Sequence, residues 1–224
     1  MVVTDWLDAT SHGWTYLSQE RSMTTGIKLT IIPATFIITA LFGCGDPEMT
    51  LSLMDAPPPG VTSVRLHIAS MDVHVVDKDK AAKNSDPSDS SIDDDDKWHS
   101  LDVDSQIDLV AHQGEDAAAV LGQLSIPEGK VTQIRLHLDA SQENAATKDD
   151  VDCNLDLSKV PDKGVKINHP FKAFATESGS SHEVVVDFEL DKSLKASGDC
   201  FIVEPVIKLH KAKTDGEEID ISVD

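Results

Sequence analysis

The stretch Val61–Ile68 (VTSVRLHI) alternates apolar and polar residues, and Val131–Leu138 (VTQIRLHL) repeats its pattern later in the chain. Alternation with a period of two residues indicates a β-strand with one buried face. There is no third copy, so the repeat is not a solenoid. We therefore expect two core strands whose leucines point inward. The outward residues form a candidate interaction patch for an anionic partner: Arg65, His67, Arg135 and His137.

Further short alternating segments extend over most of the chain, with turn residues between them and almost no helical periodicity. The alternation changes phase after Ile68, which predicts a β-bulge or a bend near Ala69 and Ser70. The last main strand is expected over Phe201–Leu209, and Pro205 would place it at a sheet edge. The sequence thus predicts an all-β fold, a single β-sandwich over residues 49–224 of the immunoglobulin-like or transthyretin-like kind.

The N-terminal part of the chain has the pattern of an export signal. Within residues 23–43, Lys28 precedes an apolar run of about 14 residues that ends at Phe42 and is too short to span a bilayer. The sequence LFGC at 41–44 resembles the lipobox of bacterial lipoproteins. The resemblance implies that Cys44 is lipidated and becomes the first residue of the mature protein. The alternative is a buried strand or helix beside a structural cysteine.

Residues 1–22 do not fit this signal, because they carry a net charge of −2 where a signal is positive. We expect an over-extended reading frame with translation starting at Met23; a genuine extra helical segment is the alternative. Residues 44–48 would form a tether between the anchor and the sandwich. The predicted location is the cell envelope, as a membrane-anchored lipoprotein of the outer membrane or facing the periplasm.

The chain is strongly acidic, with 40 Asp and Glu against 19 Lys and Arg and a net charge of −21. Such a surface repels phosphate backbones and anionic headgroups, which argues against nucleic acid and against electrostatic membrane docking. The expected partners are the membrane, through the lipid anchor, and an envelope protein. Residues 77–97 form a low-complexity acidic insert, which we predict to be a disordered loop between two strands.

Two cysteines, Cys153 and Cys200, remain after Cys44. An exported domain meets oxidising conditions, and each of the two lies at or near the start of an expected strand. We therefore expect a disulfide between them.

Catalytic motifs such as a nucleophile elbow, HExxH, a phosphate loop or CxxC are absent, so we expect neither an enzyme nor a cofactor. Asp55 follows a strand, where an Asp usually caps its own turn, and a metal ligand or a catalytic acid is the alternative. Asp187 is expected to be solvated. No metal site is predicted, although Ca²⁺ on the acidic insert or Zn²⁺ between His67 and His137 remains an alternative.

Several segments along the chain form an ordered set of short motifs, which include Leu53–Pro57, Ile126–Gly129, Gly164–Ile167, Val186–Phe188 and Glu204–Ile207. Taken in order, they resemble domain-of-unknown-function family 4382, a set of bacterial and archaeal proteins often made as lipoproteins. The resemblance covers roughly Leu51 to Leu209 and implies a β-sandwich at the envelope but no reaction. The acidic insert and the two later cysteines depart from the family's pattern. We therefore expect a lipid-anchored envelope protein that serves as a structural or interaction module.

Overall fold

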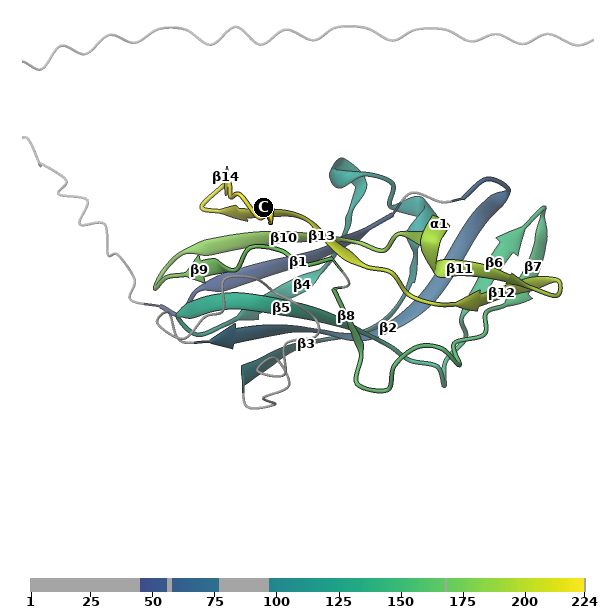
Figure 1. The fold of residues 1–224 in the computed structure, drawn as a ribbon, viewed down its shortest axis with the longest axis horizontal. Helices are drawn as coiled ribbons and strands as arrows, with labels where there is room; N and C mark the ends of the chain where they lie inside the picture. The colour runs from purple at the N-terminus through teal and green to yellow at the C-terminus, as the bar shows by residue number, and fades with distance from the viewer. Residues whose placement is uncertain (1–44, 56–57, 77–96, 168, 224) are drawn as a thin grey trace, which may run out of the picture. The chain divides into compact units, whose positions relative to one another are not determined.

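The computed structural model describes residues 45–55, 58–76, 97–167 and 169–223, and strands dominate them (Figure 1). No helix among these residues is long and apolar enough to cross a membrane. The strands are β1 (Glu48–Met54), β2 (Val61–Val76), β3 (Trp98–Asp108), β4 (Ala119–Ser125), β5 (Gly129–Leu138), β6 (Ala145–Lys148), β7 (Val151–Asn154), β8 (Val165–Lys166), β9 (Phe174–Thr176), β10 (Ser181–Asp187), β11 (Leu194–Ser197), β12 (Cys200–Val203), β13 (Lys208–Thr214) and β14 (Glu217–Glu218). The short helical turns are η3 (Leu109–Ala111), η4 (Glu115–Ala117) and α1 (Leu190–Ser193).

Two large sheets pack face to face. The first has the strand order β14-β13-β10-β1-β4, and the second has the order β7-β6-β2-β5-β8, with β3 also paired to β2 and β9 to β5. Apolar residues of β1 and β10 share one buried cluster with those of β2 and β5. The all-β prediction is confirmed, and the two packed sheets form a sandwich. The immunoglobulin-like or transthyretin-like topology stays a prediction.

The two repeated stretches lie on neighbouring strands, β2 and β5, as antiparallel partners. The register of β2 shifts between Ile68 and Ser70 against both β3 and β5, so the bulge predicted near Ala69 is confirmed. The bulge lets Leu66 and Met71 both face the core, although in a regular strand two residues five positions apart face opposite sides. The inward direction predicted for Leu66 and Leu136 is confirmed.

The start of the sandwich differs from the predicted tether. The Gly45 carbonyl accepts a hydrogen bond from the Gly179 amide at 2.8 Å, and the Pro47 carbonyl accepts one from Ile126 at 3.0 Å. Pro47 is buried, and β1 begins at the next residue. The chain is therefore fixed to the fold from Gly45 onward, and the tether expectation is wrong for residues 45–48.

Several predictions fall outside the described residues. These are the extension over residues 1–22, the signal over 23–43, lipidation at Cys44, and the acidic insert except for Lys97.

The strand predicted over Phe201–Leu209 is two strands. β12 ends at Val203 and β13 begins at Lys208, because Pro205 has no amide proton for a ladder. The segment between them is held by Ser193, whose hydroxyl accepts from the Val206 amide at 2.9 Å. The expectation that Pro205 lies in an edge strand is therefore wrong.

Candidate functional site

The predicted disulfide is present between Cys153 of β7 and Cys200 of β12, whose Cα atoms are 5.7 Å apart. It joins the second sheet to the separate β11–β12 pair. Two backbone hydrogen bonds reinforce the junction, since the Asp156 amide donates to Phe201 at 3.0 Å and its carbonyl accepts from Val203 at 2.8 Å. The prediction is confirmed, and the bridge fixes one end of the sandwich.

The four residues of the candidate interaction patch point to the outer face of the second sheet, but carboxylates accompany them. Arg65 Nη2 lies 3.7 Å from Asp152 Oδ2. His67 Nε2 lies 3.0 Å from Asp104 Oδ1, and His137 Nε2 lies 2.7 Å from Asp72 Oδ2. Carboxylates therefore offset much of the positive charge that motivated this patch, and its role in binding stays a prediction.

The prediction that Arg135 is exposed is wrong, because only 7% of its surface is accessible. Its guanidinium carbon lies 3.5 Å from the centre of the Trp98 ring. In the strand register, Arg135 also stands opposite Asp72 of β2. The alternation gives the right face for Arg135, but a large ring from β3 covers that part of the face.

Asp72 is the charge at the centre of this outer face. Burial alone would raise the pKa of its carboxyl group, but hydrogen bonds from His137 and Ser100 and the charges of His137 and Arg135 outweigh burial and lower the pKa. The Ser100 hydroxyl donates to Asp72 Oδ1 at 2.7 Å. Asp72 is therefore ionised at neutral pH and links β2, β3 and β5.

Replacing Arg135 with Ala should lower the free energy of unfolding by about 1–3 kcal/mol, because it removes the stacking on Trp98 and leaves Asp72 with one charged neighbour fewer. The matched change Arg65→Ala should stay within about 0.5 kcal/mol, since its ion pair is partly exposed. Urea unfolding of both variants measures the difference. Equal losses for the two arginines would contradict the burial of Arg135.

The zinc alternative depended on His67 and His137 lying together with a carboxylate. The bulge places His137 opposite Ser70, and each histidine is beside its own aspartate. Within the described residues, no group of three or more His, Cys, Asp or Glu side chains is arranged to hold a metal ion. The aspartates proposed for Ca²⁺ lie outside the described residues.

The Asp55 carboxyl group, for which the sequence predicted a turn cap, reaches a segment far from it in the chain, and residues 56–57 of that turn lie outside the described residues. The Asp55 side chain is fully buried, with 0% exposure, and Oδ1 accepts a hydrogen bond from the Leu190 amide at 2.8 Å. Leu190 is the first residue of α1, and the amide of a first helical residue has no partner within its helix. Asp55 therefore fixes the start of α1 to the end of β1.

Asp187 is also buried, at 8% exposure, so the expectation that it is solvated is wrong. Its Oδ2 atom lies 3.0 Å from Lys208 Nζ, and Lys208 is its partner in the register of β13. Lys208 also donates to Glu189 Oε1 at 2.9 Å, as does Lys192 at 2.7 Å. Burial opposes ionisation of Glu189, but these two hydrogen bonds outweigh it and lower its pKa. The cluster is a structural ionic network.

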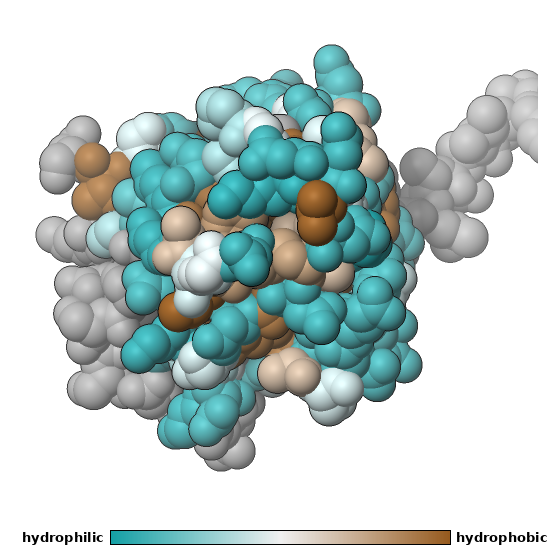
Figure 2. Space-filling view, turned by 90° about the vertical axis from the view of Figure 1, so that its right-hand side faces the viewer, coloured by the Kyte–Doolittle hydropathy of each residue, from teal (hydrophilic) through white to brown (hydrophobic). Residues whose placement is uncertain are grey.

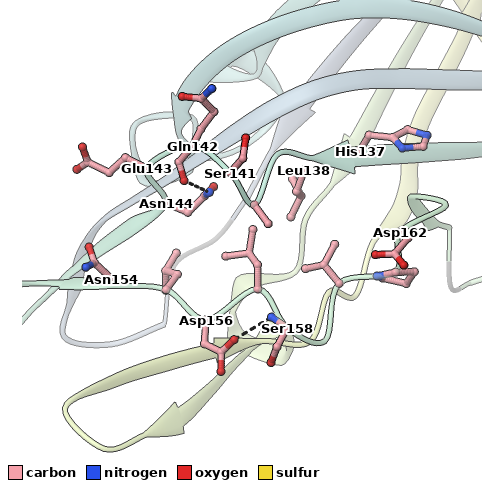
Figure 3. Close-up of a pocket in the computed structure, with 15 residues that line it drawn as sticks. His137, Leu138, Ser141, Gln142, Glu143, Asn144, Asn154, Asp156, Ser158 and Asp162 are labelled. Carbon is pink, nitrogen blue, oxygen red and sulfur yellow. Dashed lines mark hydrogen bonds between the residues drawn. The ribbon is translucent and has the colours of Figure 1, made fainter.

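A cavity of about 830 Å³, here called the polar pocket, lies between residues 137–144 and 154–162 (Figure 3). Asn144 Nδ2 donates to the carbonyls of Asp139 at 2.9 Å and Gln142 at 3.0 Å, while its Oδ1 accepts from the His67 amide at 2.8 Å. Asp156 Oδ1 accepts from the Ser158 amide at 2.8 Å. These hydrogen bonds fix the loops that line the polar pocket.

A second cavity of about 650 Å³, here called the lysine groove, is next to the polar pocket, and Pro161 lines both. Sequence reasoning missed the groove because its lysines come from two separate segments of the chain. The only local signal was the spacing of the first three lysines around Gly164. The lysines are Lys159, Lys163, Lys166, Lys192 and Lys195.

Comparison with known proteins gives a family but no close relative. No curated protein and no solved structure matches the chain significantly. The model of the family described as Domain of unknown function (DUF4382) matches residues 47–205, which include strands of both sheets and all of the cavity lining except Val206. The chain therefore belongs to the DUF4382 family.

Proposed function

We propose that this protein is a lipid-anchored component of the cell envelope that acts as a binding or structural module. The Cys153–Cys200 disulfide supports an oxidising compartment, because such bridges persist in exported proteins. The LFGC sequence at 41–44 supports the anchor. The two cavities, of about 830 and 650 Å³, support a binding role, since hydrogen bonds fix the loops of the first before any ligand arrives.

The observation that carries the proposal is the position of Gly45. It directly follows Cys44, and its carbonyl accepts hydrogen bonds from the Gly179 amide at 2.8 Å and the Ser178 hydroxyl at 3.2 Å. The sandwich thus begins immediately after the lipobox-like sequence. A lipid on Cys44 would hold this end of the sandwich against the membrane.

The anchor is tested by replacing Cys44 with Ala in the full chain. The variant should lose palmitate labelling and leave the membrane fraction, because the acceptor thiol is gone. The matched control replaces Cys153 and Cys200 with Ala, and it should keep both the label and the membrane association. Palmitate labelling of the Cys44 variant, together with membrane fractionation, would show that the proposed anchor is wrong.

A further inference from the structure

We propose that the lysine groove binds an extended acidic segment of a partner protein, in which acidic and apolar residues alternate. This inference deepens the proposed binding role, but it does not depend on lipidation of Cys44. The charge, the apolar lining, the rigid walls and the position of the groove lead to this partner.

The groove concentrates positive charge on a very acidic chain. Five lysines line the groove, and Glu204 is the one carboxylate among its lining residues. The whole chain, by contrast, has a net charge of −21. Like charges repel, so such a cluster is unfavourable unless an anion meets it. Of the five, Lys192 is also bonded to Glu189 inside the ionic network. Lys159, Lys163 and Lys195 are exposed.

The rest of the lining is apolar, which favours a peptide over a phosphate polymer. Val165, Pro205 and Val206 contribute to the groove together with the lysines. Arginine, the usual side chain for paired hydrogen bonds to phosphate, does not line it. A segment with alternating acidic and apolar residues would place its carboxylates near the lysines and its apolar side chains against these residues.

The groove also runs beside an outer strand. β8 ends the order of the second sheet, and its Lys166 and Val165 both line the groove. Extended peptides commonly bind along such strands. Figure 2 looks onto this end of the molecule and shows hydrophilic residues surrounding smaller apolar areas.

Both walls of the groove are fixed before any partner arrives. On one wall, the Ser193 carbonyl accepts a hydrogen bond from the Glu204 amide at 2.8 Å. The Ser193 hydroxyl donates one to the Glu189 carbonyl at 2.8 Å. On the other wall, Gly164 has φ +83, and a Cβ atom there would lie 2.7 Å from the His137 ring. Only glycine allows this close approach in that conformation. Binding therefore costs little ordering of the groove itself.

The groove lies at the end of the sandwich remote from Gly45. β1 starts beside Gly45 and, at about 3.3 Å per residue, extends about 20 Å to the point where Asp55 holds α1. In Figure 1 the chain enters β1 at the left, whereas α1, β11 and β12 lie at the right. This distance exceeds the screening length at physiological salt. An anchor at Cys44 would therefore present the groove away from its own membrane, toward another protein.

The test measures binding of a short fluorescent peptide of alternating Glu and Val to the full-length protein in detergent, by fluorescence anisotropy. The groove variant carries Lys159→Glu, Lys163→Glu and Lys195→Glu. Its affinity for the peptide should fall by about tenfold or more. The control variant carries Lys97→Glu, Lys172→Glu and Lys213→Glu, which changes the net charge equally elsewhere, and should retain most of the affinity. Binding by the wild type should weaken as salt increases.

Three kinds of outcome would overturn the inference. The first is a failed comparison: the wild type does not bind the peptide, or the groove and control variants lose equal affinity. The second is tighter binding of inorganic polyphosphate or of vesicles containing phosphatidylglycerol, which would assign the groove to a different anion. The third is that the groove variant self-associates but keeps its affinity, which would mean that the lysines only protect the edge of β8. Palmitate labelling of the same variants tests the anchor separately.

Discussion

Replacing Leu136 with Ala is expected to lower the free energy of unfolding by about 2–5 kcal/mol, because Leu136 is fully buried in the centre of the sandwich. It lies on β5 opposite Met71 of β2 and Val165 of β8. Truncation there removes apolar contacts on both sides and leaves a cavity that neighbouring strands cannot close. Leu66→Ala, on the repeated stretch in β2, should cost a similar amount.

Urea unfolding followed by circular dichroism measures this loss. Val120→Ala is the matched control, since Val120 also lies on a strand but is 68% exposed, and its change should be within about 0.5 kcal/mol. If Leu136→Ala unfolds at the same urea concentration as Val120→Ala, the inward face of β5 has been assigned wrongly.

Removal of the disulfide is the second large effect. Replacing Cys153 and Cys200 with Ala should lower the free energy of unfolding by about 4 kcal/mol in the chain-entropy model, because the bridge closes a loop with a sequence separation of 47. Among the described residues, β12 forms a ladder with β11 and with no strand of either large sheet. The bridge is therefore its covalent link to the second sheet. We therefore expect the β11–β12 pair to unfold first in the variant.

Urea unfolding of the double variant, compared with the untreated wild type, measures the effect. Hydrogen exchange resolves whether protection falls first in β11 and β12. Alkylation of the unreduced wild type, followed by mass spectrometry, should find neither thiol. Labelling of both Cys153 and Cys200 under these conditions would contradict the bridge.

The elements that the sequence predicts well are those that depend on local alternation. The inward leucines of β2 and β5 follow from period-two patterning, and the phase change after Ile68 correctly predicts the bulge. The disulfide was predictable because only two cysteines remained after Cys44. These inferences need no knowledge of which strands become neighbours.

The predictions that were wrong depend on neighbours that are distant in sequence. Alternation places Asp187 on the outer face correctly, but Lys208 across the sheet covers it. Arg135 is covered in the same way by Trp98. The bond from Asp55 to the start of α1, which no local pattern predicts, joins residues 135 positions apart. Local pattern gives the direction of a side chain, whereas exposure depends on what packs over it.

The lysine groove was missed for a related reason. Lys159, Lys163 and Lys166 come from the segment before and within β8, while Lys192 and Lys195 come from α1 and β11. In the sequence the first segment carries three of these lysines and the second only two, so neither segment alone shows the full cluster. Only the folding of both segments to the same end of the sandwich brings their charges together.

The pairing of β1 sets the order in which the protein can fold. β1 lies between β4 and β10, and its pairing with β10 is parallel. Both neighbours come much later in the chain than β1. Synthesis runs from the N-terminus to the C-terminus. The chain therefore contains Met49, Leu51 and Leu53 of β1 before it contains the strands that bury them. Contacts between such distant segments form slowly. In the newly made chain, β1 therefore stays unpaired and exposed until β4 and β10 have been synthesised. An exposed apolar strand is prone to aggregate, so the chain requires protection from aggregation during that interval.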